Sequence, residues 1–270
     1  MLNFGYQSTD SPFPIVPDRG FTRIDFKKMR IDKGLMVAVV AAILTSGCAA
    51  LPPGGPQDIN DPFEPVNRLT FDTTLAVDKG VFRPTAIAYR RIVPEPLRDS
   101  VRNFLNNLDS PIILANDVLQ GETNRAGITL IRAGVNTTFG LGGLLDVASR
   151  WGYMRHYEDF GQTLAVWGVG EGPYLFVPLL GPGNPRDVIG WIADLAFDPF
   201  TYLQWPHKFE WQAGKWGIDY VDLRARNIET LDDLEKTSLD LYASLRSLYR
   251  QSRNNEIRNG APEVQDLPDF

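Results

Sequence analysis

The sequence predicts a nearly all-α protein in which amphipathic helices alternate with glycine-rich loops. Beyond residue 60, apolar side chains recur at intervals of three and four residues, the spacing of one helix face. Prolines stand at the starts of several such segments, where a helix tolerates a residue without an N–H group. Only Tyr174 to Leu180 has the composition of a strand, and Pro178 makes it a poor interior strand.

The first helix is expected to begin within Asp61-Pro62-Phe63-Glu64. Asp61 can cap the helix, Pro62 suits the first helical position and Glu64 suits the third. Apolar residues then follow along roughly one side, at Val66, Leu69, Val77 and Val81. Gly80 and the pair Arg83-Pro84 are expected to close this helix.

The next helices are also delimited by prolines. A short helix is predicted from Pro84 to Arg91, before Pro94, and Pro96 opens another. In the latter, apolar residues match the amphipathic template and polar residues lie opposite: Leu97, Val101, Phe104, Leu105 and Leu108 against Arg98, Asp99, Arg102, Asn103 and Asn106. Two more helices are expected at 111–120 and 123–139.

The centre of the chain is rich in glycine, and the remainder returns to helix. Loops are predicted at 140–143 and 168–172, followed by helices at 185–196, from Lys215 onwards with a break near 230–233, and from about Ser238. The tail from Asn259 is polar and is predicted to be disordered. No internal repeat is present in the sequence.

The N-terminal region has the pattern of an exported lipoprotein. Basic residues precede the apolar run Gly34 to Leu44, and small residues then lead to Cys48. A cysteine at the cleavage point indicates that its thiol receives a diacylglyceryl group, although Leu44 lies one position further away than usual. The run is too short for a bilayer span, which needs about 20 residues. Cys48 is therefore the predicted lipid attachment site; the alternative is a free buried thiol behind a weak membrane anchor.

These features predict four segments. Residues 1–47 form a signal peptide, for which a translation start at Met29 would give an ordinary length. Residues 48–60 form a lipidated N-terminus and flexible linker, whose reach is about 20 Å. Residues 61–256 form the helical domain, and residues 257–270 form a disordered tail.

Composition limits the classes of partner and of stabilising bond. The net charge of −6 disfavours nucleic acid as a partner and disfavours adhesion through a polybasic patch. A single cysteine excludes a disulfide within one chain, so that stability must come from packing.

No catalytic or metal-binding pattern stands out. The two histidines, His156 and His207, have no neighbour at metal-binding spacing, and the sequence holds no HExxH, G-x-S-x-G or P-loop motif. Glu158-Asp159 beside His156 could serve acid–base chemistry, but adjacent acids on a loop are more often solvated. We therefore expect no enzyme, no metal and no cofactor other than the covalent lipid on Cys48.

The glycines at 140–143 admit two interpretations. They can end a helix and permit a tight turn, or Gly140, Gly142 and Gly143 can form a hinge beside a channel, because they separate two apolar helices. A phosphate cradle is disfavoured, since no strand precedes them.

All six tryptophans lie in the second half of the chain. This distribution favours contact with a membrane interface, where amphipathic rings gather, although core packing explains any single tryptophan equally well.

Several motifs resemble those of the MlaA (VacJ) lipoproteins of Gram-negative outer membranes. They are Asp61-Pro62-Phe63-Glu64-Pro65-Val66-Asn67-Arg68, Val93-Pro94-Glu95-Pro96, Asn116-Asp117-Val118-Leu119-Gln120-Gly121, Asn136-Thr137-Thr138-Phe139-Gly140-Leu141-Gly142-Gly143, and Glu158 to Leu164 continuing through Trp167-Gly168-Val169-Gly170, Gly172-Pro173-Tyr174, Pro178 to Pro182 and Arg186-Asp187. The resemblance covers about residues 58 to 236, in matching order.

This resemblance implies a compact, ring-like lipoprotein embedded on the inner leaflet of the outer membrane, at its periplasmic face. An amphipathic channel would admit phospholipids misplaced in the outer leaflet. It would pass them to a soluble periplasmic carrier that feeds an inner-membrane ATP-driven transporter, preserving lipid asymmetry. Association with a trimeric porin and an absence of catalysis are also implied. The competing hypotheses are a structural porin-associated lipoprotein without lipid transport and a lipid hydrolase, for which the nucleophile motif is missing.

Overall fold

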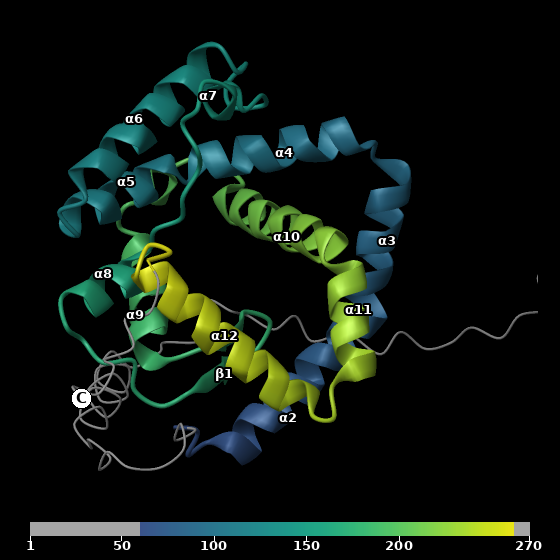
Figure 1. Ribbon diagram of the computed structural model, residues 1–270. Coiled ribbons are helices and arrows are strands. Elements are labelled where there is room, and N and C mark those ends of the chain that lie inside the picture. The colour runs from purple at the N-terminus through teal and green to yellow at the C-terminus, as the bar shows by residue number, and fades with distance from the viewer. Residues whose placement is uncertain (1–59, 262–270) are drawn as a thin grey trace, which may run out of the picture. The chain divides into compact units, whose positions relative to one another are not determined.

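Helices make up most of the part of the chain that the computed structural model describes, residues 60–261 (Figure 1). The predicted signal peptide, the Met29 start, Cys48, the linker to residue 59 and the tail from residue 262 lie outside the described residues. In chain order the elements are α2 (Glu64–Val77), η2 (Asp78–Phe82), α3 (Arg83–Ile92), α4 (Glu95–Leu108), α5 (Ser110–Leu119), α6 (Thr123–Thr138), α7 (Val147–Arg150), α8 (Phe160–Val166), β1 (Leu175–Val177), β2 (Gly181–Gly183), α9 (Pro185–Asp194), η3 (Pro199–Thr201), α10 (Lys208–Arg226), α11 (Ile228–Thr237) and α12 (Leu241–Ile257).

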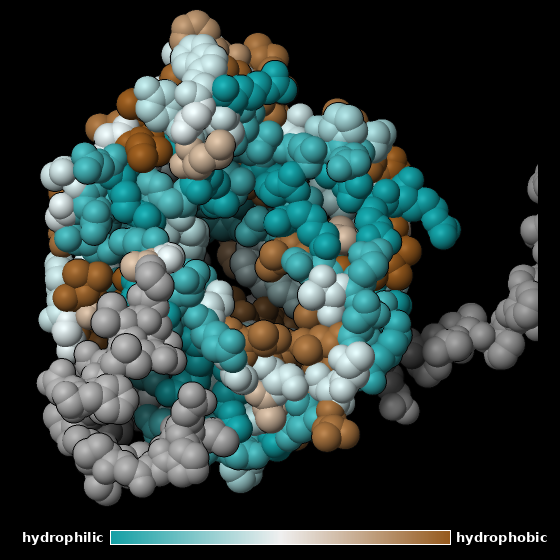
Figure 2. Space-filling view, viewed as in Figure 1, coloured by the Kyte–Doolittle hydropathy of each residue, from teal (hydrophilic) through white to brown (hydrophobic). Residues whose placement is uncertain are grey.

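Within this unit, pairs of helices surround a central hollow. α3 packs along α10, α5 along α6 and α8 along α9, while α12 reaches both α8 and β2. Figure 1 shows these pairs around an opening, and Figure 2 shows a hollow at the same place, with hydrophobic side chains on part of its wall. The predicted all-α class and the ring-like arrangement are confirmed. Among residues 60–261, no helix is long and apolar enough to cross a membrane.

Prolines mark the helix starts as predicted. Pro96, Pro111 and Pro185 each lie in the first turn of a helix. The first N–H groups of a helix have no partner within it, so a proline there removes no hydrogen bond. The observed bounds of α5 and α6 agree with the predicted ones to within one residue.

The predicted capping role of Asp61 is wrong. α2 begins at Glu64, and its N-terminal flanking residue, Phe63, makes no side-chain cap. Asp61 is instead buried, where it accepts hydrogen bonds from Asn67 Nδ2 at 2.8 Å, Tyr242 Oη at 2.5 Å and Arg246 Nη1 at 2.6 Å. This carboxylate therefore joins the start of the domain to α12.

The predicted stop at Gly80 and Arg83-Pro84 is also wrong, because the chain continues helically from α2 into α3 through the π-helical segment η2. The Arg83 N–H donates to the carbonyl of Asp78, five residues back. In a regular helix the Pro84 ring would clash with the carbonyl of Gly80. A local widening by one residue is a known way to accommodate such a clash without ending the helix.

Two predicted boundaries near the C-terminus are misplaced. α10 begins at Lys208 rather than Lys215, directly after His207, whose positive φ of 66° turns the chain into the helix. α11 runs through the predicted break at 230–233. The break lies instead at Asn227, between the end of α10 and the start of α11. Gly214 does not interrupt α10, because the packing of α10 on α3 outweighs the low helix propensity of glycine.

The predicted extended segment forms β1, and β2 pairs with it in an antiparallel hairpin that the sequence did not indicate. The Asn67 side chain continues the pairing on the other side: its Nδ2 donates to the Tyr174 carbonyl at 3.0 Å, and its Oδ1 accepts from the Phe176 N–H at 2.9 Å. Behind the hairpin lies the aromatic core, defined as Phe71, Tyr174, Phe176 and Tyr242, with ring centroids 5.4 to 6.0 Å apart.

Candidate functional site: an amphipathic hollow

The described residues bury polar side chains and expose apolar ones. More polar and charged residues than hydrophobic residues are buried, and Asn116, Asp117 and Gln162 are completely enclosed. Conversely, large apolar side chains are exposed along most of the helices; Ile92 is 76% exposed and Phe209 is 78% exposed. Exposed apolar surface on this scale indicates a surface that contacts lipid or another protein.

One cavity of the hollow, the apolar chamber, has a volume of about 240 Å³. Its walls come from α2, the hairpin, α10, α11 and α12, and are formed mainly by apolar side chains: Phe71, Leu75, Phe176, Leu179, Leu180, Tyr220, Leu231, Leu241 and Leu245. α2 and the hairpin lie far from α10, α11 and α12 in the chain, so only the closed arrangement of Figure 1 produces the chamber.

Charged side chains form one edge of the apolar chamber. Arg224 of α10 holds Asp78 of η2 through two parallel contacts, Nε to Oδ1 at 2.9 Å and Nη2 to Oδ2 at 3.0 Å. Arg83 binds Asp232 at 2.6 Å, and Lys79 binds Glu235. The Arg83 hydrogen bond lowers the pKa of the Asp232 carboxyl. The chamber thus joins an apolar wall to a row of ion pairs.

A second cavity, of about 350 Å³, lies beside α9 and the end of α12. Tyr157, Val188 and Trp191 line it together with carboxylates. Leu180, Gly181 and Pro182 of the hairpin line both cavities, so the hairpin separates them.

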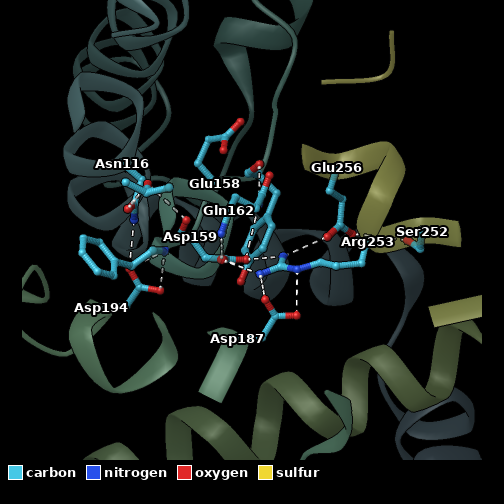
Figure 3. Close-up of polar contacts among 12 residues, drawn as sticks. Asn116, Glu158, Asp159, Gln162, Asp187, Asp194, Ser252, Arg253 and Glu256 are labelled. Carbon is cyan, nitrogen blue, oxygen red and sulfur yellow. Dashed lines mark hydrogen bonds and ion pairs between the residues drawn. The ribbon is translucent and has the colours of Figure 1, made fainter. Parts of the chain in front are cut away.

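Arg253 of α12 is the centre of an ion-pair cluster at the second cavity (Figure 3). Its guanidinium contacts both oxygens of Asp159 at 2.7 Å and both oxygens of Asp187 at 2.9 and 3.0 Å, and it also binds Glu256. Burial alone would raise the pKa of the Asp159 carboxyl, but the hydrogen bonds and charge of Arg253 lower it. The cluster fixes α12 to α8 and α9.

A second cluster, the polar core, lies between α5, α8 and α9 and is defined as Asn116, Asp117, Gln162, Thr163 and Asp194. Asn116 connects three elements: its Nδ2 donates to Asp194 Oδ1 at 2.9 Å, and its Oδ1 accepts from Thr163 Oγ1 at 2.8 Å. Asp194 also accepts from the Phe160 N–H at 3.1 Å. Burial nevertheless raises the pKa of Asp194 to about 6.

The expectation that Glu158 and Asp159 are solvated is wrong. Glu158 is 1% exposed and pairs with Arg125 at 2.5 Å, while Asp159 pairs with Arg253. His156 contacts the buried Asp117 through Nε2 at 2.9 Å. Both acids are therefore occupied by structural ion pairs, and neither is a free acid–base group.

The glycines proposed as a hinge form a hydrogen-bonded turn after α6. The Gly142 and Gly143 N–H groups donate to carbonyls of α6, those of Thr137 at 3.0 Å and Asn136 at 2.8 Å, and both glycines have positive φ. At Gly140 an added Cβ would lie 2.2 Å from the Leu145 carbonyl oxygen. This is the geometry of a helix end with a tight turn; the hinge stays a prediction.

Sequence reasoning missed the buried acceptors and the arginines that bind them. Asp159 and Arg253 are separated by 94 residues, and no local spacing reveals such a pair. The available signal was the run from Glu158 to Leu164, which belongs to the family resemblance.

Comparison with known proteins agrees with this geometry. The family described as MlaA lipoprotein matches residues 59–256. The chain belongs to the MlaA family. Relatives named "Intermembrane phospholipid transport system lipoprotein MlaA" are 30% identical in Haemophilus influenzae, covering 88% of this chain and 96% of the relative, and 34% identical in Escherichia coli, covering 84% and 89%.

A solved structure from work on the structural basis for maintenance of bacterial outer membrane lipid asymmetry is also similar. It is 35% identical, with a TM-score of 0.67, and the match covers 73% of this chain and 98% of that chain. The family assignment therefore rests on sequence and on fold. The MlaA relatives are named for lipid transport and not for an enzymatic activity.

Proposed function

We propose that this chain is a lipoprotein of the outer membrane that removes mislocalised phospholipids from the outer leaflet and passes them to a soluble periplasmic carrier. Its role is to maintain lipid asymmetry, and it acts as a passage and not as an enzyme. The observation that carries the proposal is the combination of an apolar exterior with a hollow that is apolar along one wall and charged along another.

The exterior suits a leaflet of a membrane. Five tryptophans, Trp151, Trp167, Trp191, Trp211 and Trp216, are exposed. Indole rings are amphipathic and are enriched at the depth of lipid headgroups. Most backbone polar groups are paired within helices. A surface in contact with hydrocarbon requires this pairing, because no water is present there to bond the backbone groups. These features support a body that lies in the inner leaflet.

The hollow suits a molecule with a charged head and apolar tails. The apolar chamber offers a water-poor wall to an acyl chain, while the ion pairs of Arg224, Arg83 and Lys79 offer polar groups to a headgroup. A passage lined only by apolar groups would reject the head, since moving an isolated charge out of water has a large free-energy cost.

The anchor and the partners belong to the same proposal. An acylated Cys48 would hold the body near the bilayer, because each buried CH₂ contributes about 0.8 kcal/mol. We expect association with a trimeric porin and delivery, through the soluble carrier, to an inner-membrane ATP-driven transporter. Family membership and the names of the MlaA relatives support this assignment.

The proposal is tested by measuring outer-leaflet phospholipid in cells that lack the gene. Complementation with the wild-type gene is expected to restore asymmetry, whereas Cys48→Ala is expected to fail. Leu231→Glu, which places a charge on the chamber wall, is expected to fail as well, while Leu239→Glu at a fully exposed position is the matched control.

A porin scaffold that moves no lipid makes the opposite prediction. In that case Leu231→Glu would restore asymmetry as well as the wild type does, and the purified chain would hand no phospholipid to a soluble carrier. Either result would remove the transport proposal.

A further inference from the structure

A small polar pocket lies between α4, α5, α6 and the segment that joins α7 to α8. Its volume is about 20 Å³, room for about one water molecule or a headgroup oxygen and not for an acyl chain. The lining includes the guanidinium groups of Arg132 and Arg155, which can only donate hydrogen bonds, and the side-chain amides of Asn103, Asn107 and Asn136. Each of these three amide nitrogens donates one hydrogen bond within the chain and has a second N–H group. The pocket can therefore receive an acceptor.

Only one carboxylate, Asp146, is among the residues described as lining this pocket, and it is already occupied. It accepts hydrogen bonds from Arg132 Nη2 at 3.1 Å, Asn136 Nδ2 at 3.0 Å and Ser149 Oγ at 2.6 Å. Burial alone would raise the pKa of the Asp146 carboxyl, but these hydrogen bonds lower it. Asp146 thus neutralises the charge of Arg132, and no other carboxylate among the lining residues is left to neutralise a second cation.

Arg155 is that second cation. Within residues 60–261 its guanidinium has no hydrogen bond and no ion pair, and the acid that acts on it most strongly, Asp109, is bound by Lys215 at 2.8 Å. Arg155 is exposed and lines the pocket. A guanidinium stays charged at any physiological pH, so the pocket holds an uncompensated positive charge.

We propose that this pocket receives one oxygen of the phosphate group of a phospholipid, while the exposed Arg155 binds the remainder of that phosphate and recognises its charge; the inference rests on the proposed function. Guanidinium groups match phosphate oxygens in a two-pronged geometry, and the asparagine amides supply further donors. Because the pocket excludes acyl chains, the rest of the lipid lies outside it.

The surroundings provide a place for the tails. Tyr157, two residues beyond Arg155, lines the second cavity of about 350 Å³. Two residues span at most about 7 Å along the chain. The backbone that carries Arg155 therefore leads to this second cavity, where the acyl chains of a phospholipid bound at Arg155 would lie and which inorganic phosphate would not need.

The test compares Arg155→Gln with a matched control, Arg150→Gln. Arg150 is also exposed, but it does not line the pocket. The full lipidated chain is incubated with mixed detergent micelles that contain phosphatidylethanolamine and phosphatidylglycerol, and is then reisolated. Its bound phospholipid is measured by phosphorus content and mass spectrometry. We expect Arg155→Gln to retain about tenfold less lipid, the effect of one lost charged hydrogen bond. Arg155→Lys should recover part of the loss, and Arg150→Gln should match the wild type.

Lipid retention by Arg155→Gln equal to that of the wild type would overturn the inference and leave the proposed function intact. A wild-type chain that retains no phospholipid would instead overturn the proposed function, and the inference with it. A parallel titration of delipidated protein with inorganic phosphate identifies the source. If Arg155→Gln weakens phosphate binding and leaves lipid retention unchanged, the assignment to a lipid headgroup is wrong.

Discussion

The aromatic core and the polar core hold the same ring of helices by different forces. In the aromatic core, Phe71, Phe176 and Tyr242 pack edge to face, as in a water-soluble protein. In the polar core, Asn116 and Asp194 are enclosed by hydrogen bonds, while apolar residues of the same helices, such as Val118 and Ile192, face outwards. A chain that offers its apolar side chains to lipid has fewer of them for its interior, and hydrogen bonds take their place.

α12 connects the two regions. It begins at the aromatic core with Tyr242 and ends at the polar side of the ring with Arg253.

The first prediction concerns a substitution that breaks this connection. Arg253→Met would leave Asp159 without its cation and Asp187 with Arg186 alone, and loss of one partner of a buried ion pair typically destabilises by about 3–5 kcal/mol. Chemical unfolding followed by circular dichroism measures the loss.

Arg250→Met is the control for Arg253→Met. Arg250 also lies on α12 and pairs with Glu171 at 2.9 Å, but both side chains are about one-third exposed, 34% and 31%. Such a pair contributes about 1 kcal/mol or less. Equal losses in the two variants would show that the Arg253 cluster does not fix α12 to α8 and α9.

The second prediction concerns Asp194, where the polar core carries a charge at a net cost. Burial raises the pKa of Asp194 to about 6, against an ordinary value near 3.9. Between about pH 4 and pH 6 the folded chain holds a proton that the unfolded chain has lost, so stability falls as pH rises through this window. Asp194→Asn should remove that slope and raise stability above pH 6 by about 3 kcal/mol.

The substitution keeps the acceptor geometry, because one oxygen of residue 194 serves both Asn116 Nδ2 and the Phe160 N–H. Unfolding free energies at pH 4.5, 6 and 7.5 distinguish the outcomes. A variant with the same slope as the wild type would show that Asp194 is ionised in the folded chain throughout this range.

The helical segments could be predicted where the information is local. The spacing of apolar residues and the prolines placed α4, α5 and α6 almost correctly, because a helix face and a first-turn proline depend on near neighbours. The start of α10 and the passage through η2 could not be predicted, since packing and backbone widening decide them. The polar core could not be predicted either, because its contacts join distant parts of the chain: Asn116 and Asp194 are separated by 78 residues.

The third prediction compares a leucine placed in each core. Asn116→Leu conserves volume approximately but removes the hydrogen bonds of Asn116 to Asp194 and Thr163. Loss of a hydrogen bond to a charged group such as Asp194 destabilises by about 1.5–3 kcal/mol. Phe71→Leu keeps an apolar contact in the aromatic core and should be milder, about 1–2 kcal/mol. Thermal unfolding of both variants under one set of conditions tests the order. The reverse order would mean that the polar core contributes less to stability than the aromatic core.

The last prediction concerns the turn at Gly140, Gly142 and Gly143, which separates α6 from α7. Positive φ disfavours any residue with a Cβ, so the double variant Gly142→Ala with Gly143→Ala should destabilise the protein by about 1–2 kcal/mol per site. In Gly143→Ala, the added Cβ would also clash with the Asn107 side chain. If the turn acts as a hinge, cells with the double variant should accumulate more outer-leaflet phospholipid than the loss of stability alone would cause. Gly214→Ala, at an open position inside α10, is the control, because alanine there favours the helix. Normal asymmetry in the double variant would leave these glycines with the single role of ending α6, which their hydrogen bonds already support.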